Sequence, residues 1–223
     1  GQLTPYPITF DLRAPIDHDR VPVWVGNVYE PLVHRDAQGK MHPGPVARWR
    51  ISDDGKTVEL TLREGLLWHR PACAAAGEPT PVTPADLAYS IRAHWQQPGR
   101  YARLAPEDSD PPAVETLDAR TVRVRLAHAA PYLPTLLAKT LLIPAGVTAC
   151  GGPMAPTVHV GTGPFTDSGR SSKGELALTA FERYWGRDRA QRRLPYLEGL
   201  RFRRVLDVDT ALSDLHAGRL HAF

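Results

Sequence analysis

The most informative segment of this sequence is Val160-Gly161-Thr162-Gly163-Pro164-Phe165. Two glycines flank the threonine, and Pro164 restricts the backbone angle φ at its own position, so the chain turns sharply with its amides exposed. A phosphate-binding loop would need a following helix and a Lys-Ser/Thr pair, and neither follows here. The turn is therefore expected to bring the chain back into a core sheet. Such a turn can also place Thr162 at the edge of a cleft.

Composition indicates an ordinary folded domain with no preference for nucleic acid. The chain has 223 residues, of which 42% are hydrophobic and 23% charged, enough for one large domain or two small ones. The net charge of +3 arises from 27 basic and 24 acidic residues. This excess is too small and too dispersed for a nucleic-acid surface. The pairs Arg192-Arg193 and Arg203-Arg204 are interpreted as solvated surface.

The cysteines leave two alternatives open. Cys73 and Cys150 lack the close spacing of zinc or redox sites, and both lie in stretches rich in Ala, Gly and Pro. They form either a loop-to-loop disulfide in an oxidising compartment or two unpaired thiols. No apolar run is long enough to span a bilayer, and the start at Gly1 carries no secretion signal. A secreted protein in its mature form is compatible with that start.

Two local units are clearly signalled. Residues 47–52 and 57–63 alternate between apolar and polar side chains around the turn Asp53-Asp54-Gly55-Lys56, which predicts a β-hairpin. The same turn lacks the further acidic ligands of a calcium loop. Residues 84–97 are predicted as a helix capped by Thr83, because apolar residues recur every four positions at Leu87, Ile91 and Trp95.

The remaining chain mixes strands and helices without strict alternation. The fold class is therefore expected to be α/β of a mixed α+β kind. Polar or Gly/Pro-rich stretches at 98–112 and 145–157 are expected to be a loop and a linker. The other expected elements are strands at 7–12, 32–35, 121–126, 141–144, 176–181 and 200–205, and helices at 21–29, 131–139 and 208–217, the last closed by Gly218.

An ordered set of short motifs resembles one known family. The chain is similar, from Asn27 to Gly218, to the extracellular solute-binding proteins of family 5, the peptide- and nickel-binding receptors of ABC importers. No single motif is diagnostic, but their joint order and spacing is. The matching segments are Asn27 to Val33, Pro45 to Trp49, Ser52 to Thr57, Leu62 to His69, Thr83 to Ile91, Gly161 to Phe165 and Tyr184 to Gly186.

The resemblance implies a periplasmic binding protein-like lobe with a mixed sheet and an inserted α+β subdomain. Residues 1–44 and 155–223 would form the discontinuous core of the first lobe, and 45–154 the insert. Family members are longer and close like a clamshell around the solute. The segment from Leu212 to Leu220 matches the passage before the second lobe, so that lobe is expected to be absent from this chain. One surface alone should bind weakly.

The implied function is the substrate-binding component of an ABC importer. It would bind an oligopeptide or a similar small solute without catalysis and without a cofactor, in the periplasm or outside the cell. The permease would be its partner in the full-length protein. Two alternatives remain: a solute-sensing domain of a transcription regulator with the same fold, and a single-lobe protein that pairs with another chain. No catalytic motif such as Gly-x-Ser-x-Gly or His-Glu-x-x-His occurs.

The resemblance places Tyr29, Glu30 and Pro31 at the ligand pocket, with Thr162 and Trp185 as further candidates. In the family the segment around Glu30 lines the pocket and can pair with an extended peptide as an added strand. Alternatively, Tyr29 is a core residue and Glu30 a surface or salt-bridged carboxylate, and Trp185 packs against Tyr184.

His69 has no second metal ligand near it in the sequence. We interpret it as a structural histidine.

Overall fold

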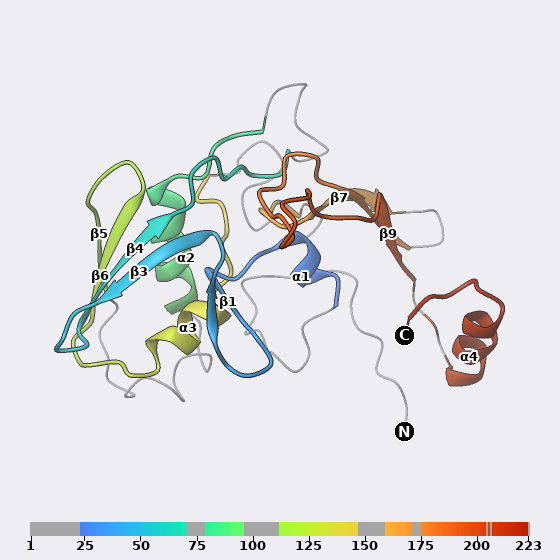
Figure 1. The fold of residues 1–223 in the computed structure, drawn as a ribbon, viewed down its shortest axis with the longest axis horizontal. Coiled ribbons are helices and arrows are strands. Elements are labelled where there is room, and N and C mark those ends of the chain that lie inside the picture. Colours follow the sequence, from blue (N-terminus) through green and yellow to red (C-terminus); the bar gives the residue numbers. More distant parts are fainter. Residues whose placement is uncertain are drawn as a thin grey trace.

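The computed structural model describes residues 23–70, 79–95, 112–146, 159–170, 175–203, 205 and 207–222. Cys73, Cys150, the expected strand at 7–12 and most of the expected linker at 145–157 lie outside these ranges. The described part contains helices and antiparallel strands in three sheets, which agrees with the predicted mixed class (Figure 1). Within these ranges no helix combines the length and apolar character needed to cross a bilayer.

The largest sheet has the strand order β3-β4-β6-β5, with every neighbouring pair antiparallel. Its strands are β3 (Val46–Ile51), β4 (Thr57–Leu62), β5 (Ala113–Thr116) and β6 (Thr121–Arg125). The predicted hairpin is confirmed as β3 and β4. Along β4 the alternating residues Val58, Leu60 and Leu62 are buried, so one face of the sheet forms a core.

Strand β5 was not predicted from the sequence. It has four residues, three of them exposed, and it follows the polar, Pro-rich stretch at 98–112. An edge strand this short and polar carries almost no alternating apolar signal. Its pairing with β6 and a 2.7 Å hydrogen bond from Arg92 to the Val114 carbonyl hold it in place.

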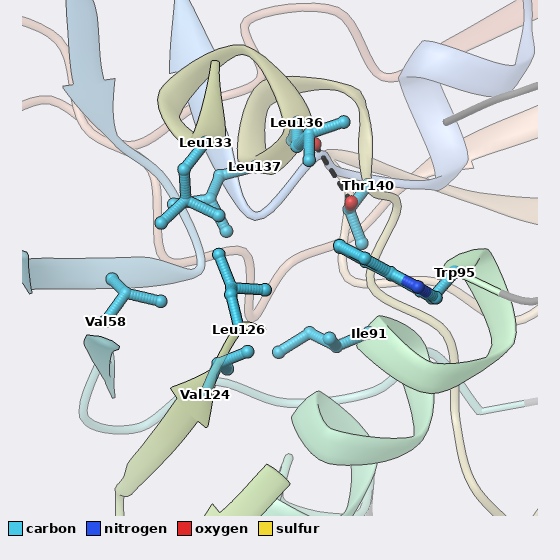
Figure 2. Close-up of a pocket in the computed structure, with 9 residues that line it drawn as sticks. All are labelled: Val58, Ile91, Trp95, Val124, Leu126, Leu133, Leu136, Leu137 and Thr140. Atoms are coloured by element: carbon cyan, nitrogen blue, oxygen red, sulfur yellow. Dashed lines mark hydrogen bonds between the residues drawn. The ribbon is translucent and has the colours of Figure 1, made fainter. Parts of the chain in front are cut away.

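Helices α2 (Pro84–Trp95) and α3 (Leu133–Lys139) lie against this sheet and close its core. Where they meet β4 and β6, a cavity of about 20 Å³ remains (Figure 2). Its walls are aliphatic and aromatic apart from Thr140, whose hydroxyl donates to the Leu136 carbonyl at 2.9 Å. With no free polar partner on its walls, this small void is a packing gap and not a binding site.

A second core forms around the other sheet, β7 (Phe165–Arg170), β8 (Leu176–Ala180) and β9 (Gly199–Phe202), with helix α1 (Val25–Val28). Strand β7 was also missed by sequence. Helix α1 is much shorter than the predicted 21–29, because Tyr29 is already extended and Glu30 precedes a proline, which disfavours helical geometry. The buried residues of this core are Trp24, Val25, Val28, Tyr29, Ile143, Phe165, Leu176 and Leu178.

Two smaller units complete the described chain. Strands β1 (Val33–Arg35) and β2 (Met41–Pro43) form a hairpin, of which only the first strand was predicted. Helix α4 (Val208–His216) is confirmed, with Asp207 accepting from the Thr210 amide and Gly218 in the left-handed region at φ 66°. In Figure 1, α4 stands apart from the two sheets.

An extended segment at 140–145 joins the two cores. On one side, polar residues of α2 accept from alternate amides: Ser90 Oγ from Ile143 at 2.9 Å and Asp86 Oδ1 from Ala145 at 2.8 Å. His94 Nε2 accepts from Leu141 in the same way at 3.3 Å. The spacing fits because four helical residues and two extended residues both rise roughly 6 Å. Side chains of α2 thus supply the acceptors that a neighbouring β-strand would otherwise offer to this segment.

On its other side the same segment pairs with the chain around Pro31. Leu142 donates to the Glu30 carbonyl at 2.9 Å, and Leu32 donates to the Thr140 carbonyl at 2.8 Å. The predicted strand at 141–144 is therefore a single antiparallel bridge, Pro31 to Leu141, within a buried extended segment.

Candidate functional site

A buried carboxylate lies where the two cores meet. Glu30 is 2% exposed and lies two residues after the end of α1 at Val28. The Tyr184 hydroxyl donates to its Oε1 at 3.0 Å, and the Trp185 indole Nε1 donates to its Oε2 at 3.0 Å. His34 Nε2 lies 3.6 Å from Oε1. Both oxygens of Glu30 are thus engaged by protein donors.

The chain after β8 brings the aromatic pair to this position. Phe181 donates to the Pro164 carbonyl at 2.8 Å, and Tyr184 donates to the Phe181 carbonyl at 2.9 Å, so the turn is tied to the glycine-rich stretch. Burial raises the pKa of Tyr184, and the negative charge of Glu30 raises it further. The phenol therefore keeps the proton that it donates to Glu30.

Arg63, which follows β4, covers the Trp185 ring. Its guanidinium carbon lies 3.9 Å from the ring centroid, within the range of a cation–π contact. Its Nε donates to the Gly44 carbonyl at 3.2 Å. Burial lowers the pKa of Arg63 and the Glu30 charge opposes that shift, so the side chain stays cationic near neutral pH. The indole is therefore fixed by an acceptor at its edge and a cation on its face.

The glycine-rich turn packs against the end of α1. A methyl group on Gly161 would lie 1.9 Å from the Val28 carbonyl oxygen, and one on Gly163 would lie 2.6 Å from that of Asn27. The Gly163 amide donates to the Val28 carbonyl at 2.9 Å. This approach leaves no room for a side chain at either glycine.

His69 clamps the same turn from the other side. Its Nε2 donates to the Gly163 carbonyl at 2.8 Å, its Nδ1 accepts from the Gly161 amide at 3.3 Å, and its own amide donates to the Gly161 carbonyl at 2.8 Å. Burial lowers the pKa of His69 to about 4, so the ring is neutral at pH 7. The predicted structural role of His69 is confirmed by these hydrogen bonds.

Tyr29 and Thr162 are both sealed from solvent. Tyr29 is 3% exposed, and its hydroxyl lies 3.5 Å from Nδ1 of the buried His159. Burial raises the pKa of Tyr29, and the nearby Asp167 adds to the shift. Thr162 is 1% exposed, and its hydroxyl finds no hydrogen-bond partner among the described residues. Neither side chain offers a surface to a solute in this conformation.

The structure therefore brings only some of the predicted site residues together. Glu30 and Trp185 are in direct contact, whereas Thr162 lies in the clamped turn and Tyr29 in the second core. Pro31 and Trp185 are half-buried. Around Pro31 the Glu30 carbonyl and the Leu32 amide are already paired within the chain, so those groups are not open to an added peptide strand.

Sequence reasoning did not single out His34 or Arg63, and it considered Tyr184 only together with Trp185, as a packed aromatic pair or a cleft wall. Arg63 and Tyr184 lie inside the quoted motifs, next to Leu62 and Trp185. Their position inside a motif could have marked both Arg63 and Tyr184 as candidate site residues. Their convergence on one carboxylate was not readable, because Tyr184 is 154 residues away from Glu30 in the sequence.

The geometry can be set beside known proteins. A model of the family described as bacterial extracellular solute-binding proteins, family 5 Middle, matches residues 40–223. The chain is 35% identical over 141 residues to the probable peptide ABC transporter periplasmic-binding protein y4tO of Sinorhizobium fredii, covering 62% of this chain and 24% of that protein. It is 23% identical over 229 residues to the oligopeptide-binding protein OppA of Bacillus subtilis, covering 95% of this chain and 40% of that one.

A solved structure has the same fold. The periplasmic binding protein DppA of Helicobacter pylori, in complex with the peptide STSA, superposes with a TM-score of 0.75 at 20% identity. The superposition covers 97% of this chain and 44% of that one. The predicted periplasmic binding protein-like fold is thereby confirmed, and the chain spans less than half the length of these relatives.

Proposed function

Because this chain belongs to the bacterial extracellular solute-binding proteins of family 5, we propose that it is part of the substrate-binding component of an ABC importer. It binds an oligopeptide or a similar small solute and catalyses no reaction. The observation that carries the proposal is Trp185, whose indole is fixed by Glu30 and Arg63 and yet stays half-buried where the two cores meet. A rigid, partly open aromatic surface suits a solute.

The relatives support the role in an ABC importer over the alternative role as a solute-sensing domain of a transcription regulator. Their printed names describe a peptide ABC transporter periplasmic-binding protein and an oligopeptide-binding protein. By the same likeness, the protein acts in the periplasm or outside the cell, and a permease is its partner.

The division into a first-lobe core at 1–44 and 155–223 and an insert at 45–154 is part of the proposal. The two separate hydrophobic cores support it, since one centres on β3, β4, β5 and β6 and the other on β7, β8 and β9. Leu32, Val33 and Val160 pack into the core of the insert, so they would form the seam between the units.

Within the site we propose two roles. Pro31 and Trp185 touch the solute, since both keep accessible surface. Tyr29, Glu30 and Thr162 hold the frame behind them, since each is at most 3% exposed. A peptide would therefore meet the edge of the cluster and not its buried carboxylate.

Equilibrium dialysis of the 223-residue chain against tri-alanine tests the proposal. The chain is expected to retain an excess of the peptide at millimolar concentration, and the peptide is expected to be recovered intact. Affinity is expected to be weak because the chain presents one side of a clamshell. No retention, or hydrolysis of the peptide, would contradict the proposed function.

A further inference from the structure

We propose that Arg63 is a docking point for a carboxylate group of the solute. The inference deepens the proposed function and rests on it. It starts from the cation that lies over the Trp185 ring at 3.9 Å, in a position that the sequence did not identify as a site.

The guanidinium of Arg63 has donors to spare. It carries five N–H groups, of which Nε is used by the Gly44 carbonyl at 3.2 Å. The Arg63 amide is bonded to the Pro45 carbonyl at 2.8 Å, and within the described ranges the Arg63 side chain makes no other hydrogen bond and no ion pair within 4.0 Å. The two terminal nitrogens of a half-buried guanidinium are thus left for a group from outside.

The buried carboxylate nearby does not use these donors. Glu30 accepts from Tyr184 and Trp185 with its two oxygens, so its hydrogen bonds go to the aromatic pair. The Glu30 charge opposes the lowering of the Arg63 pKa by burial, while the Nε contact and the ring fix the direction of the guanidinium. An arginine held in this way loses little entropy when it binds.

A second basic side chain borders the same indole. The ring of His34 lies 6.5 Å from that of Trp185, and the side chain of His34 is 40% exposed. The surface beside Trp185 therefore presents a permanent cation, Arg63, and an accessible imidazole, His34.

A planar carboxylate is the group that suits this arrangement. Two parallel N–H groups of a guanidinium match the two oxygens of a carboxylate, and such charged bonds are stronger than neutral ones. In a peptide the carboxylate comes either from the C-terminus or from an acidic side chain. The shared chemistry is the carboxylate, and the two sources are separated by amidation.

The test uses the Nε1–H NMR signal of Trp185 in the 223-residue chain, identified by its loss in Trp185→Phe. The probes are sodium acetate, tri-alanine, tri-alanine amide and Ala-Glu-Ala amide. The variant is Arg63→Gln, and the matched control is Arg48→Gln, which removes an exposed arginine from the neighbouring β3. Circular dichroism confirms that each variant is folded.

We expect acetate and tri-alanine to shift the signal saturably in the wild type and in Arg48→Gln. Amidation and Arg63→Gln should each weaken binding roughly tenfold or more, which is the loss of a hydrogen bond to a charged group. If Ala-Glu-Ala amide binds as tightly as tri-alanine, an acidic side chain can supply the carboxylate. If it binds as weakly as tri-alanine amide, the carboxylate comes from the C-terminus.

Equal affinity of acid and amide, or of wild type and Arg63→Gln, would overturn the inference while leaving solute binding intact. Binding of acetate without binding of any peptide would support the Arg63 site and count against the proposed function. No shift with any probe would overturn both.

Discussion

Among the single residues, Glu30 is the buried acceptor on which the cluster around Trp185 depends. From the sequence, two interpretations of Glu30 were open: a residue of the ligand pocket, or a salt-bridged or surface carboxylate. The structure shows neither an exposed nor a purely ion-paired group, because its two oxygens accept from Tyr184 and Trp185. Those partners are 154 and 155 positions away, so no local pattern could reveal them.

Replacing Glu30 with Gln should destabilise the fold. One oxygen becomes an amide donor that faces a donor, so a buried hydrogen bond is lost, at a cost of about 1–3 kcal/mol. Urea unfolding monitored by tryptophan fluorescence measures the change. The control is Glu64→Gln, whose carboxylate is 88% exposed and should change stability by less than about 0.5 kcal/mol. Equal midpoints for the two variants would contradict the structural role.

His69 should make stability depend on pH. The folded ring has a pKa of about 4 against an ordinary value of 6.5, so only the unfolded chain binds a proton between these values. Stability from this group is full above pH 6.5 and falls as the pH drops toward 4, by roughly 3 kcal/mol in all.

The measurement is urea unfolding at pH 7, 6 and 5 for the wild type and His69→Gln. The difference in unfolding free energy between the two proteins should shrink as the pH falls, because glutamine does not titrate. A constant difference would show that His69 is not held neutral by the fold.

At the scale of elements, helix α2 shows both what sequence can predict and what it cannot. The apolar period of Leu87 and Ile91 predicted the helix over 84–97, and the structure describes it from Pro84 to Trp95. The polar stripe of the same helix was equally visible in the sequence, but its use was not. The partner of Ser90 is the Ile143 amide, and this pairing becomes visible only in the structure, where the segment at 140–145 lies beside the helix.

Ser90→Ala should be costly for this reason. The Ile143 amide would lose its acceptor inside the protein, and an unsatisfied buried donor costs about 1–3 kcal/mol. Ser213→Ala on α4 is the matched control, since Ser213 is exposed. Hydrogen exchange should quicken at Ile143 in the first variant only. Unchanged exchange there would argue against the helix-to-segment ladder.

For the glycine-rich turn, the sequence correctly predicted that the chain returns to a sheet, since β7 begins at Phe165. It did not predict why both glycines are needed. Its glycines are required by the carbonyl oxygens of Asn27 and Val28, which no local rule could supply. Thr162, expected at a cleft edge, is buried instead.

Gly161→Ala should therefore be severely destabilising, by about 4 kcal/mol or more, because its methyl group cannot fit against backbone. Thermal unfolding and soluble yield measure this. Gly146→Ala is the control, because nothing lies within 4 Å of a methyl group there. Similar behaviour of the two variants would refute the close packing of the turn against α1.

At the scale of the whole molecule, the described chain is two cores joined at a seam. The segments at 30–32 and 140–145, the turn at 161–163 and the Trp185 cluster all lie along it. The order of the motifs was sufficient to predict the fold through the family resemblance, because each motif is a short local segment and the segments follow one another in a fixed order. Strands β2, β5 and β7 were missed because short or polar strands carry weak alternation.

We propose that a solute meets this seam at Trp185. The most direct measurement is the shift of the five indole Nε1–H signals during titration of the 223-residue chain with tri-alanine. We expect a saturable shift of the Trp185 signal, little change at Trp49 of β3, and loss of binding in Trp185→Phe but not in Trp49→Phe. A saturable shift elsewhere with Trp185 unmoved, or binding unaltered by Trp185→Phe, would contradict it.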